Sequence, residues 1–310
     1  MVTALARRRT WMAGLPFLSV AVAIPVLLAA APAMQMPHLP DLLRLAADYH
    51  ADYVTRVSGA SLDEQYQLID VTGGRMQAVT RISSDVVFVN LNGGVTALRD
   101  AYAVDTKPLR PRAARITTLL AAPATPSVKD WETVIRFPAE SSVYFALDII
   151  LKVNEPTTAL RFIAASAQPS LKYKLQGQKK INGIQTVGLN FDEPAAQDKK
   201  YLLGTRSNAR ASGRLWIDPA TGAVHRTELW VDSKGESANI TVKYAPHPAL
   251  GLLLPSETNE QYDEREAASG PRDDSRGVPS GSAGSRISFQ AQARYSKPAH
   301  APIDLRNLKK

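Results

Sequence analysis

Apolar and polar residues alternate along much of the chain, which is the pattern of β-strands that bury one face. The clearest example runs from Gly213 to Val231, where two runs rich in β-branched and aromatic residues flank Asp218-Pro219-Ala220-Thr221-Gly222. Pro219 sets the φ angle of a turn, and Gly222 accepts a positive φ. This stretch therefore predicts a β-hairpin, and the run 238–245 predicts the next antiparallel strand.

Other runs of the same kind predict that the hairpin belongs to a larger antiparallel sheet. Before it, strands are expected at 66–71, 76–82, 85–91, 95–105, 171–177, 180–191 and 201–205, with turns at Gly73-Gly74, Ser83-Ser84, Asn92-Gly93-Gly94 and Asn182-Gly183. After a proline-rich connection at 244–251, strands are expected at 252–262 and 288–295. Pro255 indicates that the first of these is an edge strand or carries a bulge.

Residues 42–57 instead repeat their apolar side chains with a helical period, between the start signal Pro40-Asp41 and the stop signal Ser58-Gly59. Short helices separated by proline are expected at 115–121, 128–137 and 156–165. The apolar run 143–153 is shorter than the roughly 20 residues of a membrane span, so we expect it to be buried. Residues from about 110 to 165 thus predict a helical insertion that covers one opening of a curved sheet.

The first 33 residues predict a cleavable export signal. The basic run Arg7-Arg8-Arg9 precedes the apolar residues 11–31, and Ala31-Pro32-Ala33 supplies a cleavage site after Ala33. The alternative is a retained membrane anchor, which Pro16 and Pro25 disfavour within so short an apolar run. We therefore expect a periplasmic or secreted protein, with general secretion and twin-arginine export both left open.

The remaining chain predicts one domain formed by residues 34–262 and 286–296. Residues 263–285 consist of Gly, Ser, Pro, Arg and Asp with almost no apolar content, so they predict a mobile loop. Residues 297–310 predict a loose tail.

Composition excludes several classes of function. The chain has no cysteine, so it forms no disulfide and performs no thiolate chemistry. The formal charge is +8, and about +5 remains without the three arginines of the signal. That excess suits transient contact with an anionic membrane surface or an ordinary solvated surface. No cluster of Lys and Arg is dense enough to predict nucleic-acid binding.

The sequence predicts no catalytic site, no metal and no cofactor. The histidines fall in no known ligand spacing: His38, His50, His225, His247 and His300. There is no G-x-S-x-G motif, and the serines of 280–285 lie in the predicted mobile loop. The paired carboxylates Asp192-Glu193 and Asp273-Asp274 lie in polar turns, where nothing separates their pKa values for acid–base work.

The hairpin 213–229, followed by Ile240-Thr-Val-Lys-Tyr and Leu253-Leu-Pro-Ser-Glu, resembles the LolA/LolB-like superfamily of periplasmic lipoprotein carriers. It is most similar to exported, uncharacterised bacterial proteins that share the Trp-Ile-Asp-Pro-Ala-Thr-Gly hairpin. This resemblance implies an α+β fold that is mainly antiparallel β, a strongly curved half-barrel with helices covering its concave side. It also implies a lipophilic cavity between sheet and helices. The long helical insertion and residues 263–285 depart from the family.

The two faces of the hairpin predict a ligand-binding set. If Ile217 pairs with His225, one face carries Leu215, Ile217, His225, Thr227, Leu229 and Val231. The other face carries Trp216, Val224, Arg226, Glu228 and Trp230. One interpretation is an amphipathic cavity wall in which Trp216, Arg226, Glu228 and Trp230 hold a lipid headgroup or peptide. The other is an Arg226–Glu228 pair on an exposed face, with both tryptophans packed by neighbouring elements.

The functional hypothesis from the sequence is a non-enzymatic envelope protein that binds a lipid, lipoprotein or other apolar ligand in the concavity of a half-barrel. The alternative is an envelope protein-interaction or structural module with a filled core, which uses the strand edge at 252–262 or the stretch 263–285. A hydrolase is disfavoured, because it would need a nucleophile, a histidine and an acid converging in one cleft.

Overall fold

The computed structural model describes residues 35–72, 75–91, 93–112, 115–120, 132–133, 136, 138–141, 144, 154–194, 209–233, 236–248, 250–264 and 287–300. The described fold belongs to the unit that begins at Met36. Several predictions lie wholly or largely outside the described residues: the signal 1–33, the helix 128–137, the run 143–153, the strand 201–205, the loop 263–285 and the tail beyond His300.

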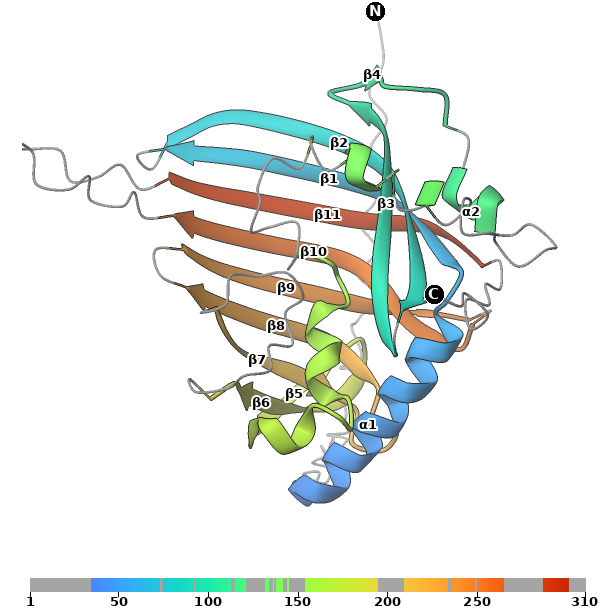
Figure 1. Ribbon diagram of the computed structural model, residues 1–310. Helices are drawn as coiled ribbons and strands as arrows, with labels where there is room; N and C mark the ends of the chain where they lie inside the picture. Colours follow the sequence, from blue (N-terminus) through green and yellow to red (C-terminus); the bar gives the residue numbers. More distant parts are fainter. Residues whose placement is uncertain are drawn as a thin grey trace, which may run out of the picture. The chain divides into compact units, whose positions relative to one another are not determined.

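Within the described part of the chain, eleven strands form one open antiparallel sheet (Figure 1). The strands are β1 Ala60–Thr72, β2 Arg75–Leu91, β3 Gly94–Val104, β4 Lys107–Pro108, β5 Lys172–Ile181, β6 Ile184–Asp192, β7 Arg210–Ile217, β8 Val224–Ser233, β9 Glu236–His247, β10 Leu252–Glu264 and β11 Ile287–His300. Their spatial order is β4-β3-β2-β1-β11-β10-β9-β8-β7-β6-β5. The prediction of a mainly antiparallel β fold is confirmed.

The last strand joins two meanders that are far apart in the sequence. Figure 1 shows β11 between β1 and β10. Tyr66 of β1 pairs with Ala293, and Glu257 of β10 pairs with Arg294. The strand runs to His300, so the prediction that the chain is loose from residue 297 is wrong for 297–300.

Two predictions about strand ends are wrong. Ser83 and Ser84 do not form a turn, because they lie inside β2, where the register against β3 shifts between them. Their hydroxyls are satisfied within the sheet: Ser83 donates to Gln65 and Ser84 to Glu64. Residues 244–247 continue β9 rather than forming a loop.

Strand β10 is not an edge strand, so the prediction of an interaction edge at 252–262 is also wrong. It lies between β9 and β11. The predicted bulge is present, as a register shift between Pro255 and Glu257. Pairing with β11 begins only at Glu257, so the missing N–H of Pro255 removes no hydrogen bond to β11.

The described helices are few and short, except for the first. Helix α1 spans Leu39–Arg56, with proline in its first turn as predicted, and α2 spans Arg115–Leu120. The expected helix at 156–165 is a 3₁₀ helix, η2, over Thr158–Ile163, and η3 follows at Gln168–Ser170. None of the helices in the described residues is long and apolar enough to cross a membrane.

Helices α1 and η2 share one buried apolar cluster with one face of strands β1 to β3 and β5 to β10. Phe162 of η2 stacks on Phe191 of β6, with ring centroids 4.4 Å apart. The segment is also held by hydrogen bonds, because Tyr173 donates to the Phe162 carbonyl at 2.5 Å and Tyr244 donates to the Pro156 carbonyl at 2.7 Å. We call the face of the sheet that carries this cluster the buried face.

A second apolar cluster lies on the strands around β11. Its buried members are Tyr66, Leu68, Ile82, Ala101, Ala291 and Ala293. Tyr144 packs against it, and among the described residues of this cluster Tyr144 alone comes from outside the strands. Helices α1 and η2 belong to the first cluster only.

Candidate functional site

The four residues predicted to bind ligand share one face of the β7–β8 hairpin. Trp216 pairs with Arg226, Arg214 with Glu228 and Ser212 with Trp230. Ile217 pairs with Val224 and not with His225, because the register shifts after Trp216. Val224 therefore joins the buried cluster, and its predicted place beside Trp216 is wrong.

Glu228 is the centre of the contacts on this hairpin face. It accepts a hydrogen bond from the Trp216 indole N–H at 3.2 Å and forms an ion pair with Arg226 at 3.0 Å. The Arg214 guanidinium lies 3.7 Å from the same carboxylate and 5.6 Å from the Trp216 ring centroid. The predicted Arg226–Glu228 pair is therefore present. Binding of a ligand by these four residues stays a prediction.

This face is the opposite of the buried face, because the alternate residues Leu215, Leu229 and Val231 belong to the first apolar cluster. An open groove of about 280 Å³ lies at one end of it. The groove is lined by Lys172, Tyr173, Lys174, Asn190, Phe191, Asp192, Ser212, Gly213 and Trp230. Of the four predicted residues, Trp230 lines the groove.

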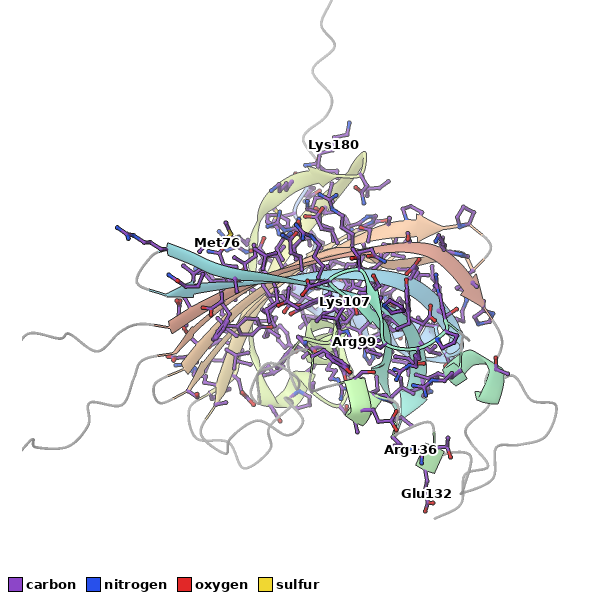
Figure 2. All side chains as sticks on the ribbon, turned by 90° about the horizontal axis from the view of Figure 1, so that it is seen from above. Met76, Arg99, Lys107, Glu132, Arg136 and Lys180 are labelled. Atoms are coloured by element: carbon purple, nitrogen blue, oxygen red, sulfur yellow. The ribbon has the colours of Figure 1, made fainter. Side chains whose placement is uncertain are left out.

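The buried face carries a group of ionisable residues that sequence reasoning did not find. Glu64 of β1 is fully buried, and the single N–H of Arg99 Nε, on β3, is shared between its two carboxylate oxygens at 3.0 and 2.9 Å. Ser84 donates to the same carboxylate at 2.6 Å. The other two nitrogens of Arg99 (labelled in Figure 2) donate to the Asn154 side chain at 3.2 Å and to its carbonyl at 2.9 Å.

Glu260 of β10 is the second carboxyl group of this set. One of its oxygens, Oε2, accepts hydrogen bonds from Tyr66 at 2.8 Å and from Tyr262 at 2.7 Å. The other oxygen, Oε1, is buried without a hydrogen-bond partner. Burial raises the pKa of Glu260 from 4.5 to about 7, against the opposing effects of the tyrosine hydrogen bonds and Arg99.

Strand register brings these groups together. Glu64 pairs with Ser84 on one side and with Tyr295 on the other, and Glu260 pairs with Ala291. Cross-strand partners share a face, so the polar groups border the second apolar cluster, to which Tyr66 and Ala291 belong. We call Glu64, Tyr66, Arg99, Glu260 and Tyr262 the buried polar cluster.

One sequence signal for this cluster exists. Leu62, Glu64, Tyr66 and Leu68 recur at every second position, which places a carboxylate in the middle of an otherwise core-facing row. Thr258, Glu260 and Tyr262 repeat the pattern in β10. Carboxylates are rarely fully buried without a partner, so such rows indicate a polar network in the core or a site.

The buried polar cluster places a few polar groups among apolar side chains. Among the described residues, no group of His, Cys, Asp and Glu side chains could hold a metal ion.

No protein-family model matches the sequence, and no curated protein is similar to it. Solved structures similar to this chain include an outer membrane lipoprotein-sorting protein domain from Vibrio parahaemolyticus, at 12% identity and a TM-score of 0.36 over 83% of this chain and 91% of that one. A LolA superfamily protein from Nitrosomonas europaea has 10% identity and a TM-score of 0.34 over 86% and 97% of the two chains. A DUF1329 family protein from Desulfovibrio piger has 9% identity and a TM-score of 0.36 over 84% and 92%. These similarities concern the path of the chain alone.

Proposed function

We propose that the chain is an exported, non-enzymatic envelope protein that binds a lipid, a lipoprotein or another apolar ligand against the buried face of its sheet. In this proposal the sheet is a curved half-barrel, and α1 and η2 cover part of its concave side. The N-terminal signal pattern supports export.

The observation that carries the proposal is the second apolar cluster with the buried polar cluster at its border. The second apolar cluster combines three alanines, Ala101, Ala291 and Ala293, with larger side chains such as Tyr66. Small residues between aromatic ones give a wall against which an acyl chain can lie. Polar groups beside such a wall can fix the orientation of a ligand.

A dye without charge or hydrogen-bond donors tests this function. The chain from Met34 onward, purified from a bacterial periplasm, should bind 1,6-diphenylhexatriene saturably. Lipid should also be detected by native mass spectrometry of the same preparation. The proposal is wrong if the folded protein neither carries lipid nor binds the dye.

A matched pair of variants locates the binding surface. Ala291→Leu adds bulk on the buried face of β11, and Gln292→Leu adds it at the next residue, on the opposite face. We expect the dye affinity to fall about tenfold in the first variant. The larger side chain would occupy part of the surface that the dye contacts, so the dye would lose apolar contact equal to most of one side chain. The second variant should bind like the unmodified protein. Thermal melting of each variant checks that it is folded.

The alternative is a protein-interaction module with a filled core. The packing of α1 and η2 in the first apolar cluster favours it, because there described side chains already fill the buried face. Under this alternative the protein is folded, lipid-free and unable to bind the dye, so the same experiment separates the two functions.

A further inference from the structure

Glu260 has one oxygen whose hydrogen-bonding capacity is unused. The residue is only 4% exposed, and Oε1 has no partner, whereas Oε2 accepts from both Tyr66 and Tyr262. An unpaired buried acceptor costs free energy, and the cost is larger for a charged group. A bound donor at Oε1 would remove that cost.

The charges of the buried polar cluster do not balance. Glu64 forms an ion pair with Arg99, whose Nε donates a hydrogen bond to the carboxylate. The remaining nitrogens of Arg99 donate to Asn154. Among the described residues, no cation forms an ion pair with Glu260 at 4 Å or less. An additional cation would balance the second carboxylate, and an additional anion would stand beside two of them.

The residues next to Glu260 on the buried face include small ones. Its cross-strand partner on β11 is Ala291, whose own partner on β1 is Leu68. Both belong to the second apolar cluster, and Ala293 follows on the same face of β11. An alkyl chain lying along these residues would bring its polar end to Glu260.

From these three observations we infer that Glu260 Oε1 anchors a ligand subsite for the primary ammonium of an amphiphile whose chain lies along Ala291 and Leu68. This inference rests on the proposed function and specifies its ligand class. An ammonium supplies both the missing positive charge and the missing donor, and charge-assisted hydrogen bonds are stronger than neutral ones. A fatty acid or a sulfate headgroup is disfavoured.

Competition against the bound dye tests the headgroup preference. Dodecylamine, dodecanol, dodecanoate and dodecyltrimethylammonium share one chain length, and each is used below its critical micelle concentration at pH 8.5. We expect dodecylamine to displace 1,6-diphenylhexatriene at about a tenfold lower concentration than dodecanoate. Dodecyltrimethylammonium, which has the charge but no N–H, and dodecanol, which has a donor but no charge, should fall between them.

In Glu260→Gln, dodecylamine and dodecanoate should displace the dye at concentrations within about threefold of each other, because the variant keeps the shape of the side chain and removes its charge. Glu257→Gln is the control, since Glu257 lies on the opposite face of the same strand in an ion pair with Lys243. It should leave the preference unchanged.

A second measurement needs no variant. At pH 5.5 Glu260 is protonated, so the amine preference of the unmodified protein should shrink relative to pH 8.5. The tyrosines that face Glu260 stay neutral across this range, because burial raises the pKa of Tyr66, Tyr262 and Tyr295. The other charged groups beside it, Glu64 and Arg99, are joined in an ion pair.

Two results would overturn the inference without contradicting the proposed function, because the protein would still bind the dye. One is displacement by dodecanoate at the same or lower concentration than by dodecylamine. The other is an amine preference that survives in Glu260→Gln. If the unmodified protein binds no dye, the inference falls together with the proposed function.

Discussion

Glu260 makes the stability of the protein depend on pH. Its pKa is raised from 4.5 to about 7, chiefly by burial. Between these two values the folded chain holds a proton at this site that the unfolded chain has released. The contribution of Glu260 to the free energy of unfolding therefore falls as the pH rises through this window, and it stays low above pH 7.

Glu260→Gln should remove this penalty. We expect the free energy of unfolding of the variant, relative to the unmodified protein, to rise by on the order of 3 kcal/mol between pH 4.5 and pH 8. Urea unfolding at a series of pH values measures the difference. Glu257→Gln should leave the difference nearly constant over this range, because hydrogen bonding by Asn259 lowers the pKa of Glu257 and its effect on stability therefore changes mainly below pH 4.5. Parallel pH profiles for the unmodified protein and Glu260→Gln would contradict the prediction.

Position 213 requires glycine, because the Glu228 backbone and the Phe191 side chain leave no room for a Cβ atom. A Cβ atom at this position would lie 2.3 Å from the Glu228 carbonyl oxygen and 2.5 Å from the Phe191 ring. Gly213→Ala should therefore destabilise the protein by roughly 2–4 kcal/mol, because backbone must shift to relieve the overlap. Gly177→Ala on β5 is the matched control, since nothing lies within 4 Å of its Cβ position. Equal urea midpoints for the two variants would refute this.

At the level of elements, the sequence predicts those that local signals define. The β7–β8 hairpin follows from Pro219 and Gly222, the β5–β6 turn from Asn182-Gly183, and α1 from its helical period and Pro40. Asn182 and Gly183 both have the positive φ that such a turn requires.

Contacts between distant segments decide what the sequence does not predict. The sequence predicts a turn at Ser83-Ser84. In the structure the two serines stay within β2, because their hydroxyls donate to Gln65 and Glu64 of the neighbouring strand β1. Pro255 suggests an edge strand, but β11, which comes later in the sequence, pairs with β10 from Glu257 onward and so leaves the proline outside the pairing. Of the candidate site, the common face of Trp216, Arg226, Glu228 and Trp230 is predictable. The buried polar cluster is not, because it joins residues of β1, β3 and β10 that are far apart in the sequence.

An aromatic contact helps to hold helix η2 against the sheet. Phe162 is fully buried and stacks on Phe191. We expect Phe162→Ala to cost about 3–5 kcal/mol, the usual range for removing a buried phenylalanine. Met76→Ala, at a position that is 67% exposed, should change stability by less than about 0.5 kcal/mol. Unfolding of both variants at the same urea concentration would show that η2 does not contribute to the core.

At the scale of the whole sheet, β11 is the element on which the others depend. It pairs with β1 over Ile287–His300 and with β10 from Glu257 to Glu264. Without it, the β1–β4 meander and the β5–β10 meander would share no strand pairing in the described residues.

Ending the chain at residue 286 should abolish cooperative unfolding. Both meanders would then expose an unpaired strand edge, and such edges promote aggregation. Ending it after His300 removes only residues outside the described sheet and should preserve a single urea transition. Circular dichroism and sedimentation of the two truncated proteins measure the outcome. A soluble, cooperatively folded protein ending at residue 286 would contradict the role assigned to β11.

The order of β1 and β11 along the chain has a consequence for biosynthesis. Roughly 200 residues separate β1 from the strand that completes its pairing, so at typical translation rates β1 waits on the order of 10–40 s for its partner. Until β11 has been made, each meander keeps an unpaired strand edge, which is the kind of surface that holding chaperones protect from aggregation.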